Sequence, residues 1–495
     1  MLFSPVMTIL GWCLSMLAAL MVVPGLLSLA EQGVGTASAF FGAAIITMFL
    51  GIGLIFATRM ETTSLGRRET FLAAILVWTI VPGFAALPFI LSGALPDFIN
   101  AYFEALSGFT TNGASVMGNL PDQPKSILLW RSLTQWVGGF AIIIFVSSLA
   151  STFNMPGNNP LNRAIAKSSR RRLSRRVRDA VLSLLRIYAL LTAICFALLW
   201  LSGMPFFHAL CYAFSTISTG GFMVTPVEAA EFGNRFTETV LIIFMVIGAI
   251  NFTLHWSYFN GNRRSYFTNP EYRYLMLVVV FGSLGLFMLL SVETDMSALD
   301  SIRIAIFNTV SALTTTGYTL PPLSESGEIY WPVGILFALL FLMTIGGSSC
   351  STAGGVKLMR VLLLFKQSGA EIKRLSFPNG VIVLKYGDIS LTREHILSAW
   401  GFFTVYCFTI VIVASGLALY DLNFQAALSL AVSNIANAGA VIDPTLTGLN
   451  SSGMDFTSYG SLPDGAKLLL CIAMLVGRLE FFAILSLFNP ALWRR

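Results

Sequence analysis

Long, nearly uncharged apolar runs alternate with short polar stretches along the whole chain. Most runs are about 20 residues long, which is the length that an α-helix needs to cross the hydrocarbon core of a bilayer. Ten such runs are present, near residues 5–30, 38–58, 70–92, 127–152, 180–202, 237–258, 273–292, 331–366, 394–420 and 466–489. The pattern predicts an all-α polytopic membrane protein with ten crossings rather than a set of soluble domains.

Four shorter apolar segments lie in the loops between these runs, and each ends in small and hydroxylated residues. They read EALSGFTTNGAS (104–115), YAFSTISTGGFM (212–223), NTVSALTTTGYT (308–319) and LAVSNIANAGAV (430–441). The segments are too short to cross a bilayer. Non-helical backbone at membrane depth is tolerated only where it is buried in protein or lines water. We therefore expect re-entrant half-helices.

The four half-helices align with one another and define a repeat. The reference position of each tip is a glycine: Gly113, Gly220, Gly317 and Gly439. In three segments a serine lies six positions before this glycine, and Phe214 is the exception. A second glycine-containing landmark recurs in the crossings that follow, at 137–139, 247–249, 345–347 and 476–478. Recurrence of two landmarks in one order indicates a repeat architecture. The predicted units are an N-terminal helical hairpin over 1–65 and pore repeats over 66–155, 156–262, 263–368 and 369–495.

Four such units folded around an axis would bring the polar tips to one place in the membrane. Backbone carbonyls of four loops can replace the water around a monovalent cation, and hydroxyl groups add neutral oxygen ligands. Glycine permits the φ values that aim successive carbonyls at a central ion. The half-helices would point their partly negative C-terminal ends at that ion. The predicted filter residues are Thr111, Asn112, Gly113, Ser218, Thr219, Gly220, Thr315, Thr316, Gly317, Asn437, Ala438 and Gly439. The alternative is that small residues at these tips only permit close helix packing.

Charged residues are scarce and are sorted by loop. The chain has 30 Lys and Arg and 24 Asp and Glu, together 11% of its 495 residues. Basic clusters near 59–68, 163–178, 263–273 and 357–393 alternate with mainly acidic loops. By the positive-inside rule, both termini are expected in the cytoplasm. The net charge of +6 therefore does not call for a nucleic-acid partner. The stretch 163–178 is expected to be a solvated loop that can also bind anionic lipid.

Sequence motifs of other protein classes are missing. The six cysteines lie far apart, and the three histidines are scattered, so neither a disulfide framework nor a zinc site is indicated. The sequence has no H-E-x-x-H and no paired aspartate motif. A membrane-embedded enzyme is therefore disfavoured.

Two features inside the predicted spans need a physical reason. Arg478 lies mid-span, where a charge is costly unless it faces water or a partner. One explanation is a buried ion pair with Glu480 or another acid. The other is a positive barrier below the filter.

The segment 346–355 crowds Gly, Ser, Thr and Cys into an apolar run, so the helix is expected to break there beside a cavity.

The chain resembles the Trk/Ktr/HKT superfamily of potassium transporters, and most closely its TrkH-type bacterial members. Besides the four filter loops, the resemblance rests on three strings, RSLTQWVGGFAIII (131–144), IGGSSCSTAGGVKLMR (345–360) and VGRLEFFAILSLFNPALWRR (476–495). It implies potassium uptake through one pseudo-fourfold pore per subunit in the bacterial inner membrane. It also implies a homodimer and a cytosolic nucleotide-binding ring partner of the TrkA type, with the nucleotide on that partner only.

The resemblance further implies a gate beneath the filter and a barrier at Arg478. The gate residues are Gly346, Gly347, Ser348, Ser349, Ser351, Thr352, Gly354, Gly355, Lys357 and Arg478. An alternative within transport is sodium- or proton-coupled symport, for which Glu480 is the one candidate carrier.

The fourth loop, with Ala438 and Ala440 around its glycine and Asp443 after it, departs from the family's richer Gly/Pro run. Because of this departure, the resemblance does not determine the ratio of potassium to sodium permeation.

Overall fold

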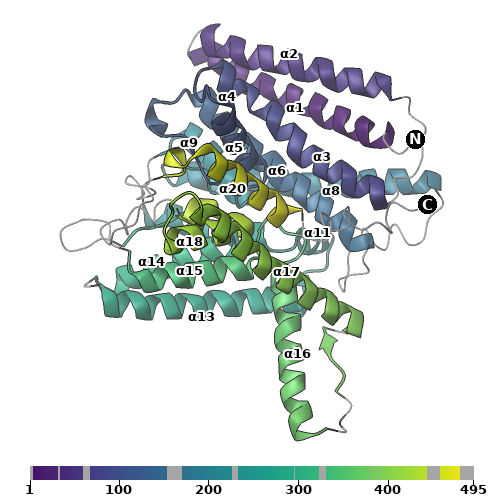
Figure 1. The fold of residues 1–495 in the computed structure, drawn as a ribbon, viewed down its shortest axis with the longest axis vertical. Coiled ribbons are helices and arrows are strands. Elements are labelled where there is room, and N and C mark those ends of the chain that lie inside the picture. The colour runs from purple at the N-terminus through teal and green to yellow at the C-terminus, as the bar shows by residue number, and fades with distance from the viewer. Residues whose placement is uncertain are drawn as a thin grey trace.

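The computed structural model is almost entirely helical (Figure 1). It describes residues 4–31, 34–58, 67–152, 170–225, 232, 234–294, 296–322, 331–378, 380, 382–387, 389–442 and 458–479. The roles expected of Asp443, of Glu480 and of residues 163–169 lie outside these described residues. Residues 170–178, expected as part of a loop, instead form the start of a helix.

Helices make up nearly all of the regular structure. The N-terminal hairpin is α1 (Ser4–Glu31) and α2 (Val34–Ala57). Then follow α3 (Arg67–Ala85), α4 (Leu87–Leu91), α5 (Phe98–Phe109), η1 (Leu120–Asp122), α6 (Lys125–Thr152), α8 (Arg170–Leu201), α9 (Phe206–Ile217), α10 (Arg235–Ala249), α11 (Phe252–Phe259) and α12 (Ser265–Thr268). The remaining elements are α13 (Pro270–Glu293), α14 (Ala298–Leu313), α15 (Val333–Ile345), α16 (Leu358–Ser376), β1 (Lys385–Tyr386), β2 (Ile389–Ser390), α17 (Arg393–Ala418), α18 (Phe424–Ala436), η3 (Gly439–Val441), η5 (Tyr459–Ser461) and α20 (Asp464–Arg478).

Most of the predicted crossings are continuous helices. Among the described residues, seven helices are long and apolar enough to span a membrane, and α10 with α11 forms an eighth, bent candidate. The run 237–258 is not the unbroken span that the sequence predicts, because the chain turns by 98° between α10 and α11. The break expected within 331–366 is confirmed, since α15 ends at Ile345 and α16 begins only at Leu358. Of the run 466–489, the structure describes α20 and the residue after it.

The four predicted half-helices are present as α5, α9, α14 and α18. They contain 12, 12, 16 and 13 residues, all too short to cross a bilayer. Three begin at a polar N-cap whose side chain accepts a backbone N–H, and these caps are Asp97, Ser297 and Asn423. Such a cap satisfies one of the free donors at a helix start. Each half-helix ends inside the protein, where its last residues are buried.

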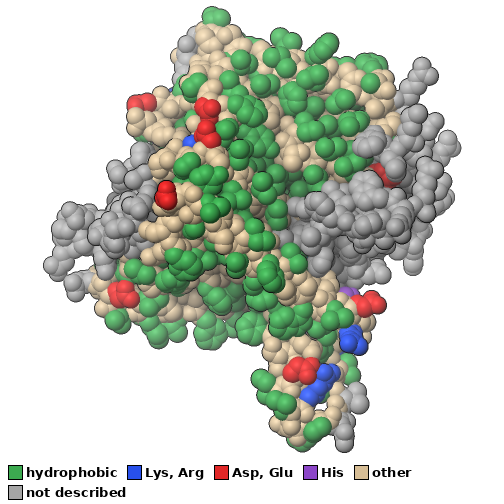
Figure 2. Space-filling model, in the orientation of Figure 1, with side chains coloured by type: hydrophobic (Ala, Val, Ile, Leu, Met, Phe, Trp, Pro, Cys, Tyr) green, Lys and Arg blue, Asp and Glu red, His purple; other side chains and the backbone are tan. Residues whose placement is uncertain are grey.

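One part of the molecule projects from the helical body. The helix α16 and the hairpin β1–β2 form this arm, with Lys385 paired to Ser390 and Tyr386 to Ile389 (Figure 1). The small hairpin was not predicted from the sequence. Figure 2 shows hydrophobic side chains over most of the visible body, while most of the visible Lys and Arg side chains lie on or beside the arm. This division is typical of a lipid-facing body and a water-facing extension.

The N-terminal hairpin is held by close approach of two backbones. A Cβ atom on Gly51 would lie 2.8 Å from the backbone N of Ser15 and 2.9 Å from the carbonyl O of Gly11. On the Gly11 side, a Cβ would lie 2.8 Å from the Gly51 carbonyl O. In a membrane, small residues let helices associate through van der Waals packing of this kind.

We expect Gly51→Leu to destabilise the protein, because the new side chain would have to displace α1. Overpacking of this kind costs about 1–3 kcal/mol. The measurement is the thermal unfolding midpoint of the detergent-solubilised protein. Gly53→Leu is the matched control, since no atom lies within 4 Å of a Cβ at Gly53. Equal midpoints for the two variants would contradict the close helix contact.

Candidate ion-selectivity filter and gate

The four half-helices end in the same backbone turn. Near each C-terminus, a backbone N–H reaches back five residues to a serine carbonyl, at 2.8 to 2.9 Å. The four pairs are Asn112 with Ser107, Gly220 with Ser215, Thr316 with Ser311, and Ala438 with Ser433. The residue before each donor also bonds three residues back. These two bonds form a Schellman motif, which satisfies carbonyls at a helix end.

Each of these turns places a residue with a side chain in the left-handed region. The four residues are Thr111, Thr219, Thr315 and Asn437, with φ values of 51° to 54°. Such values are uncommon outside glycine. Four occurrences at one structural position indicate a shared backbone geometry, which the repeat in the sequence anticipated.

The structure corrects the alignment of the second repeat. Because Thr219 takes the left-handed position, the glycine equivalent to Gly113 and Gly317 is Gly221 and not Gly220. The φ value is +78° at Gly113, +80° at Gly221 and +99° at Gly317. Two consecutive glycines make the register ambiguous in the sequence, and the backbone hydrogen bonds resolve it.

The corrected register also changes two neighbouring assignments. Ser215 now lies six positions before the reference glycine, so all four repeats share this serine and Phe214 is no exception. Ser218 moves back to the C-cap of α9, where its Oγ donates to the Phe214 carbonyl at 2.8 Å. The filter position predicted for Ser218 is therefore held by Thr219.

The four tips meet in a closed ring. We call residues 111–114, 219–222, 315–318 and 437–440 loops 1 to 4. A Cβ on Gly113 of loop 1 would clash with the carbonyl O of Gly220 in loop 2, and one on Gly221 would clash with that of Thr316 in loop 3. Loop 3 contacts loop 4 through Gly317, and the N–H of Ala440 in loop 4 donates to the Asn112 carbonyl of loop 1 at 3.3 Å.

In repeats 1, 2 and 4, the second landmark explains how the ring is supported. A Cβ on Gly138, Gly248 or Gly477 would clash with or crowd a carbonyl O in the last turn of the half-helix of its own repeat. Those carbonyls belong to Phe109, Ile217 and Ile435. Glycine at the landmark therefore lets the following helix press against the half-helix just before the tip.

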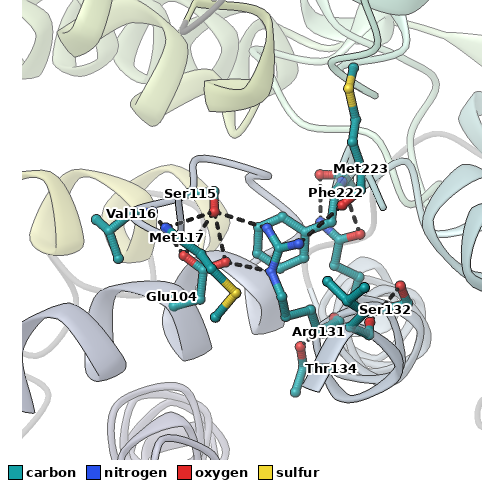
Figure 3. A network of polar contacts seen from close by, with 12 residues as sticks. Glu104, Ser115, Val116, Met117, Arg131, Ser132, Thr134, Phe222 and Met223 are labelled. Carbon is teal, nitrogen blue, oxygen red and sulfur yellow. Dashed lines mark hydrogen bonds and ion pairs between the residues drawn. The ribbon is translucent and has the colours of Figure 1, made fainter. Parts of the chain in front are cut away.

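A buried ion pair fixes the exits of loops 1 and 2 (Figure 3). Arg131 of α6 contacts Glu104 of α5 at 2.7 Å, and their side chains are only 2% and 0% exposed. The guanidinium also donates to Ser115 Oγ at 2.9 Å and to the Met223 carbonyl at 3.0 Å. It lies 4.2 Å from the centroid of the Phe222 ring. Arg131 thus joins the chain after loop 1 to the chain after loop 2.

One helical turn further along α6, Gln135 contacts loop 2 directly. Its Nε2 donates to the Gly220 carbonyl at 2.7 Å, and its Oε1 accepts from the Phe222 N–H at 3.3 Å. Sequence reasoning did not single out Arg131 or Gln135. For Arg131, the available signal was a charged side chain inside a predicted crossing, which is expensive in lipid and therefore marks a functional or supporting position.

The candidate gate is the loop 346–357, which lies against the broken helix of the second repeat. The N–H of Ser348 donates to the Ala249 carbonyl at 2.9 Å, and Thr352 Oγ1 donates to the Gly248 carbonyl at 2.9 Å. In return, the N–H of Phe252 donates to the Cys350 carbonyl at 3.2 Å. The bend between α10 and α11 thus exposes backbone groups that the gate loop satisfies, as burial in a membrane requires.

Conformational freedom at the ends of the gate loop is supplied by glycine. Gly346 and Gly355 have φ values of +71° and +75°. A Cβ on either glycine would clash with or crowd the backbone at the other. Within the loop, Ser351 Oγ donates to the Ser348 carbonyl at 2.6 Å, and the Ser349 N–H donates to Glu271 at 3.2 Å. The remaining predicted gate residues, Gly347, Gly354 and Lys357, are part of the same buried loop. Lys357 Nζ donates to the Ala353 carbonyl.

The gate loop and Arg478 contact the left-handed residues of the ring. Thr352 Oγ1 lies 3.1 Å from Thr219 Oγ1, and the Gly354 N–H donates to Thr315 Oγ1 at 2.6 Å. Arg478 donates to Thr111 Oγ1 and, at 2.6 Å, to the Thr352 carbonyl. The partners of Arg478 that the structure describes here are neutral oxygen atoms. The gate loop and Arg478 therefore lie together against one side of the ring.

A ring of four re-entrant helix tips inside a bundle of apolar spans defines a polytopic membrane protein with a candidate ion pathway. Residues 36–495 match the TrkH family, which is described as cation transport proteins. The chain belongs to this family. The sequence resemblance, the all-α polytopic fold and the prediction that the protein is not an enzyme are therefore confirmed.

Individual relatives match over the whole length. The chain is 32% identical over 501 residues to the Trk system potassium uptake protein TrkH of Vibrio parahaemolyticus, with 100% of both chains covered. It is 33% identical over 501 residues to the corresponding protein of Escherichia coli K12, with 99% of both covered. The crystal structure of the potassium transporter TrkH from Vibrio parahaemolyticus superposes with a TM-score of 0.88 at 31% identity, covering 100% of both chains.

We expect Arg131→Ala to destabilise the protein, because Glu104 would remain buried without its cation. Removing one partner of a buried pair costs about 3–5 kcal/mol. The control is Arg374→Ala, which breaks an exposed pair with Glu371 on the arm. Exposed pairs contribute about 0–1 kcal/mol. Thermal unfolding in detergent should separate the two variants, and a small effect of Arg131→Ala would show that the pair does not support the loops.

Proposed function

We propose that this protein takes up potassium through the ring of loops 1 to 4, with backbone carbonyl and hydroxyl oxygens replacing the hydration shell of the ion. The flux is driven by the membrane potential, which supplies about 2.3 kcal/mol per charge per 100 mV. The relatives described above are named potassium uptake proteins or a potassium transporter, which supports potassium as the cargo.

The observation that carries this proposal is the meeting of four equivalent helix ends. The C-terminal end of a helix is partly negative, so four such ends pointing to one region favour a cation there. The tips themselves carry hydroxyl, amide or apolar side chains and no acidic or basic residue. Selectivity then comes from the number and arrangement of neutral oxygen dipoles.

The arrangement of the gate corresponds to a closed pathway in this proposal. Thr352, Gly354 and Arg478 contact three of the four left-handed tip residues, which leaves the ring covered on that side. A guanidinium at this place repels a cation that leaves the filter. Conduction therefore requires movement of the loop 346–357 and of Arg478 away from the ring.

The distribution of charged loops and the membership of the TrkH family support proposals about location, oligomeric state and regulation. We propose a bacterial inner-membrane location with cytoplasmic termini, a homodimer, and control by a cytosolic nucleotide-binding partner of the TrkA type. The relatives are named as parts of a Trk system, which supports a second component. The basic arm formed by α16 and β1–β2 is on the side that the positive-inside rule assigns to the cytoplasm. The boundaries of the four repeats remain a prediction.

Growth of a potassium-uptake-deficient bacterium on micromolar to millimolar potassium tests the filter. We expect the unmodified protein to restore growth and Gly317→Ser to abolish it, because this position has a φ of +99° and faces Ala440. Gly285→Ser is the control, since a Cβ there meets no atom within 4 Å. Expression and membrane insertion of each variant are checked on immunoblots. Rescue by Gly317→Ser would show that the filter lies elsewhere.

Rubidium uptake into proteoliposomes tests the barrier at Arg478. We expect Arg478→Ala to raise the uptake rate severalfold, because it removes a buried positive charge beside the ring. Arg235→Ala is the control, since Arg235 is exposed at the start of α10. A folded Arg478→Ala variant with reduced uptake would indicate that Arg478 only stabilises the structure.

A further inference from the structure

Loop 4 differs in backbone conformation from the other three loops. In loops 1 to 3 the reference glycine has a positive φ and the chain continues without regular structure. In loop 4 the reference glycine, Gly439, lies outside the positive-φ region and begins the one-turn helix η3. The fourth quarter of the ring therefore does not repeat the other three.

This turn engages two of the carbonyl groups of loop 4, those of Ala438 and Gly439, in hydrogen bonds within the protein. The Ala438 carbonyl accepts from the Val441 N–H at 3.2 Å. The Gly439 carbonyl accepts from the Ile442 N–H and from the Tyr459 hydroxyl, the latter at 3.0 Å. The Gly439 carbonyl, with two donors, is a poor ligand for a passing ion, because the ion must compete with both donors. The Gly220 carbonyl of loop 2 and the Asn112 carbonyl of loop 1 accept from Gln135 and from the Ala440 N–H, respectively.

The methyl group of Ala440 lies at the centre of the ring. Cβ atoms on Gly113, Gly221 and Gly317 would lie 2.8, 2.9 and 2.5 Å from the Ala440 Cβ. These three glycines belong to three different loops. An atom that is this close to three quarters of a ring lies near its axis, where an ion would pass.

A buried side-chain network holds loop 4 in this conformation. Asn112 of loop 1 accepts the Gly439 N–H on its Oδ1 at 3.1 Å and donates from Nδ2 to Asn434 Oδ1 at 2.8 Å. Asn434 Nδ2 in turn donates to the Tyr459 hydroxyl at 3.2 Å. All three side chains are completely buried. Such a satisfied network specifies one backbone conformation.

We propose that Ala440 is a specificity-determining residue of the ion pathway, narrowing the ring with its methyl group while loops 1 to 3 supply the carbonyl ligands. The proposal rests on the ring being the filter. A methyl group on the axis penalises large cations more than small ones, and fewer carbonyl dipoles weaken the preference for potassium over sodium. Loop 4 thus sets both the rate and the selectivity.

The test compares two alanines at equivalent positions. Ala440 and Ala114 each follow the reference glycine, but the Ala440 methyl group crowds the Cβ positions of Gly113, Gly221 and Gly317, whereas the Ala114 methyl group crowds that of Gly439. In proteoliposomes we expect Ala440→Gly to raise rubidium uptake severalfold and to raise sodium uptake less. Ala440→Val should block both ions. Ala114→Gly should change the ratio of rubidium to sodium uptake less than Ala440→Gly does, and Gly285→Ser, outside the ring, should leave the ratio unchanged.

Tyr459→Phe gives a second, independent measurement. It keeps the ring shape of the side chain and removes the hydroxyl that bonds the Gly439 carbonyl. We expect a change in the ratio of rubidium to sodium uptake without loss of folded protein. An unchanged ratio in both Tyr459→Phe and Ala440→Gly would overturn the proposal.

The outcome is separable from a failure of the filter assignment. If Gly317→Ser abolishes uptake while Ala440→Gly behaves like Ala114→Gly, the ring conducts and Ala440 has no special role. If Gly317→Ser itself conducts normally, the ring is not the filter and both proposals fail.

Discussion

Backbone polar groups inside a membrane must be satisfied, and this constraint governs the centre of the protein. A half-helix that stops at membrane depth leaves carbonyl groups without partners, at a cost of several kcal/mol each in lipid. The Schellman turns at the ends of α5, α9, α14 and α18 satisfy part of this demand. They do so by placing Thr111, Thr219, Thr315 and Asn437 in the left-handed region, which turns the chain back out of the half-helix.

The ring that results is supported from outside by different means in different quarters. Loops 1 and 2 are held by Arg131 and Gln135, two neighbouring positions on α6. Loop 4 is held by amide and phenol groups, with Asn112 of loop 1 as the link between quarters. A pseudo-fourfold architecture therefore has unequal quarters, because four diverged copies in one chain can each acquire their own contacts. In our proposal, that inequality allows one loop to narrow a pathway that the other three line.

Breaks in helices expose backbone groups at the candidate gate, just as helix ends do at the candidate filter. The bend between α10 and α11 frees the carbonyls of Gly248 and Ala249, and the loop 346–357 supplies donors to both. The gate loop also donates to the ring itself, through Gly354. Movement of the loop would expose these groups, so opening requires water or other donors to replace it.

The sequence by itself determined the membrane class, most of the spans, the four half-helices and the break after Ile345. This is because burial in lipid and tight turns each require particular residue types within a short stretch of the chain. Only the tertiary structure decided the register at Gly220 and Gly221, the bend in the second repeat and the partner of Arg131. It also decided the position of Ala440. The contact between Asn112 and Gly439 joins residues 327 positions apart, and neither residue is unusual in its own segment. Contacts between residues so far apart in the sequence depend on how four similar units pack around one axis. A local pattern of side chains does not predict that packing.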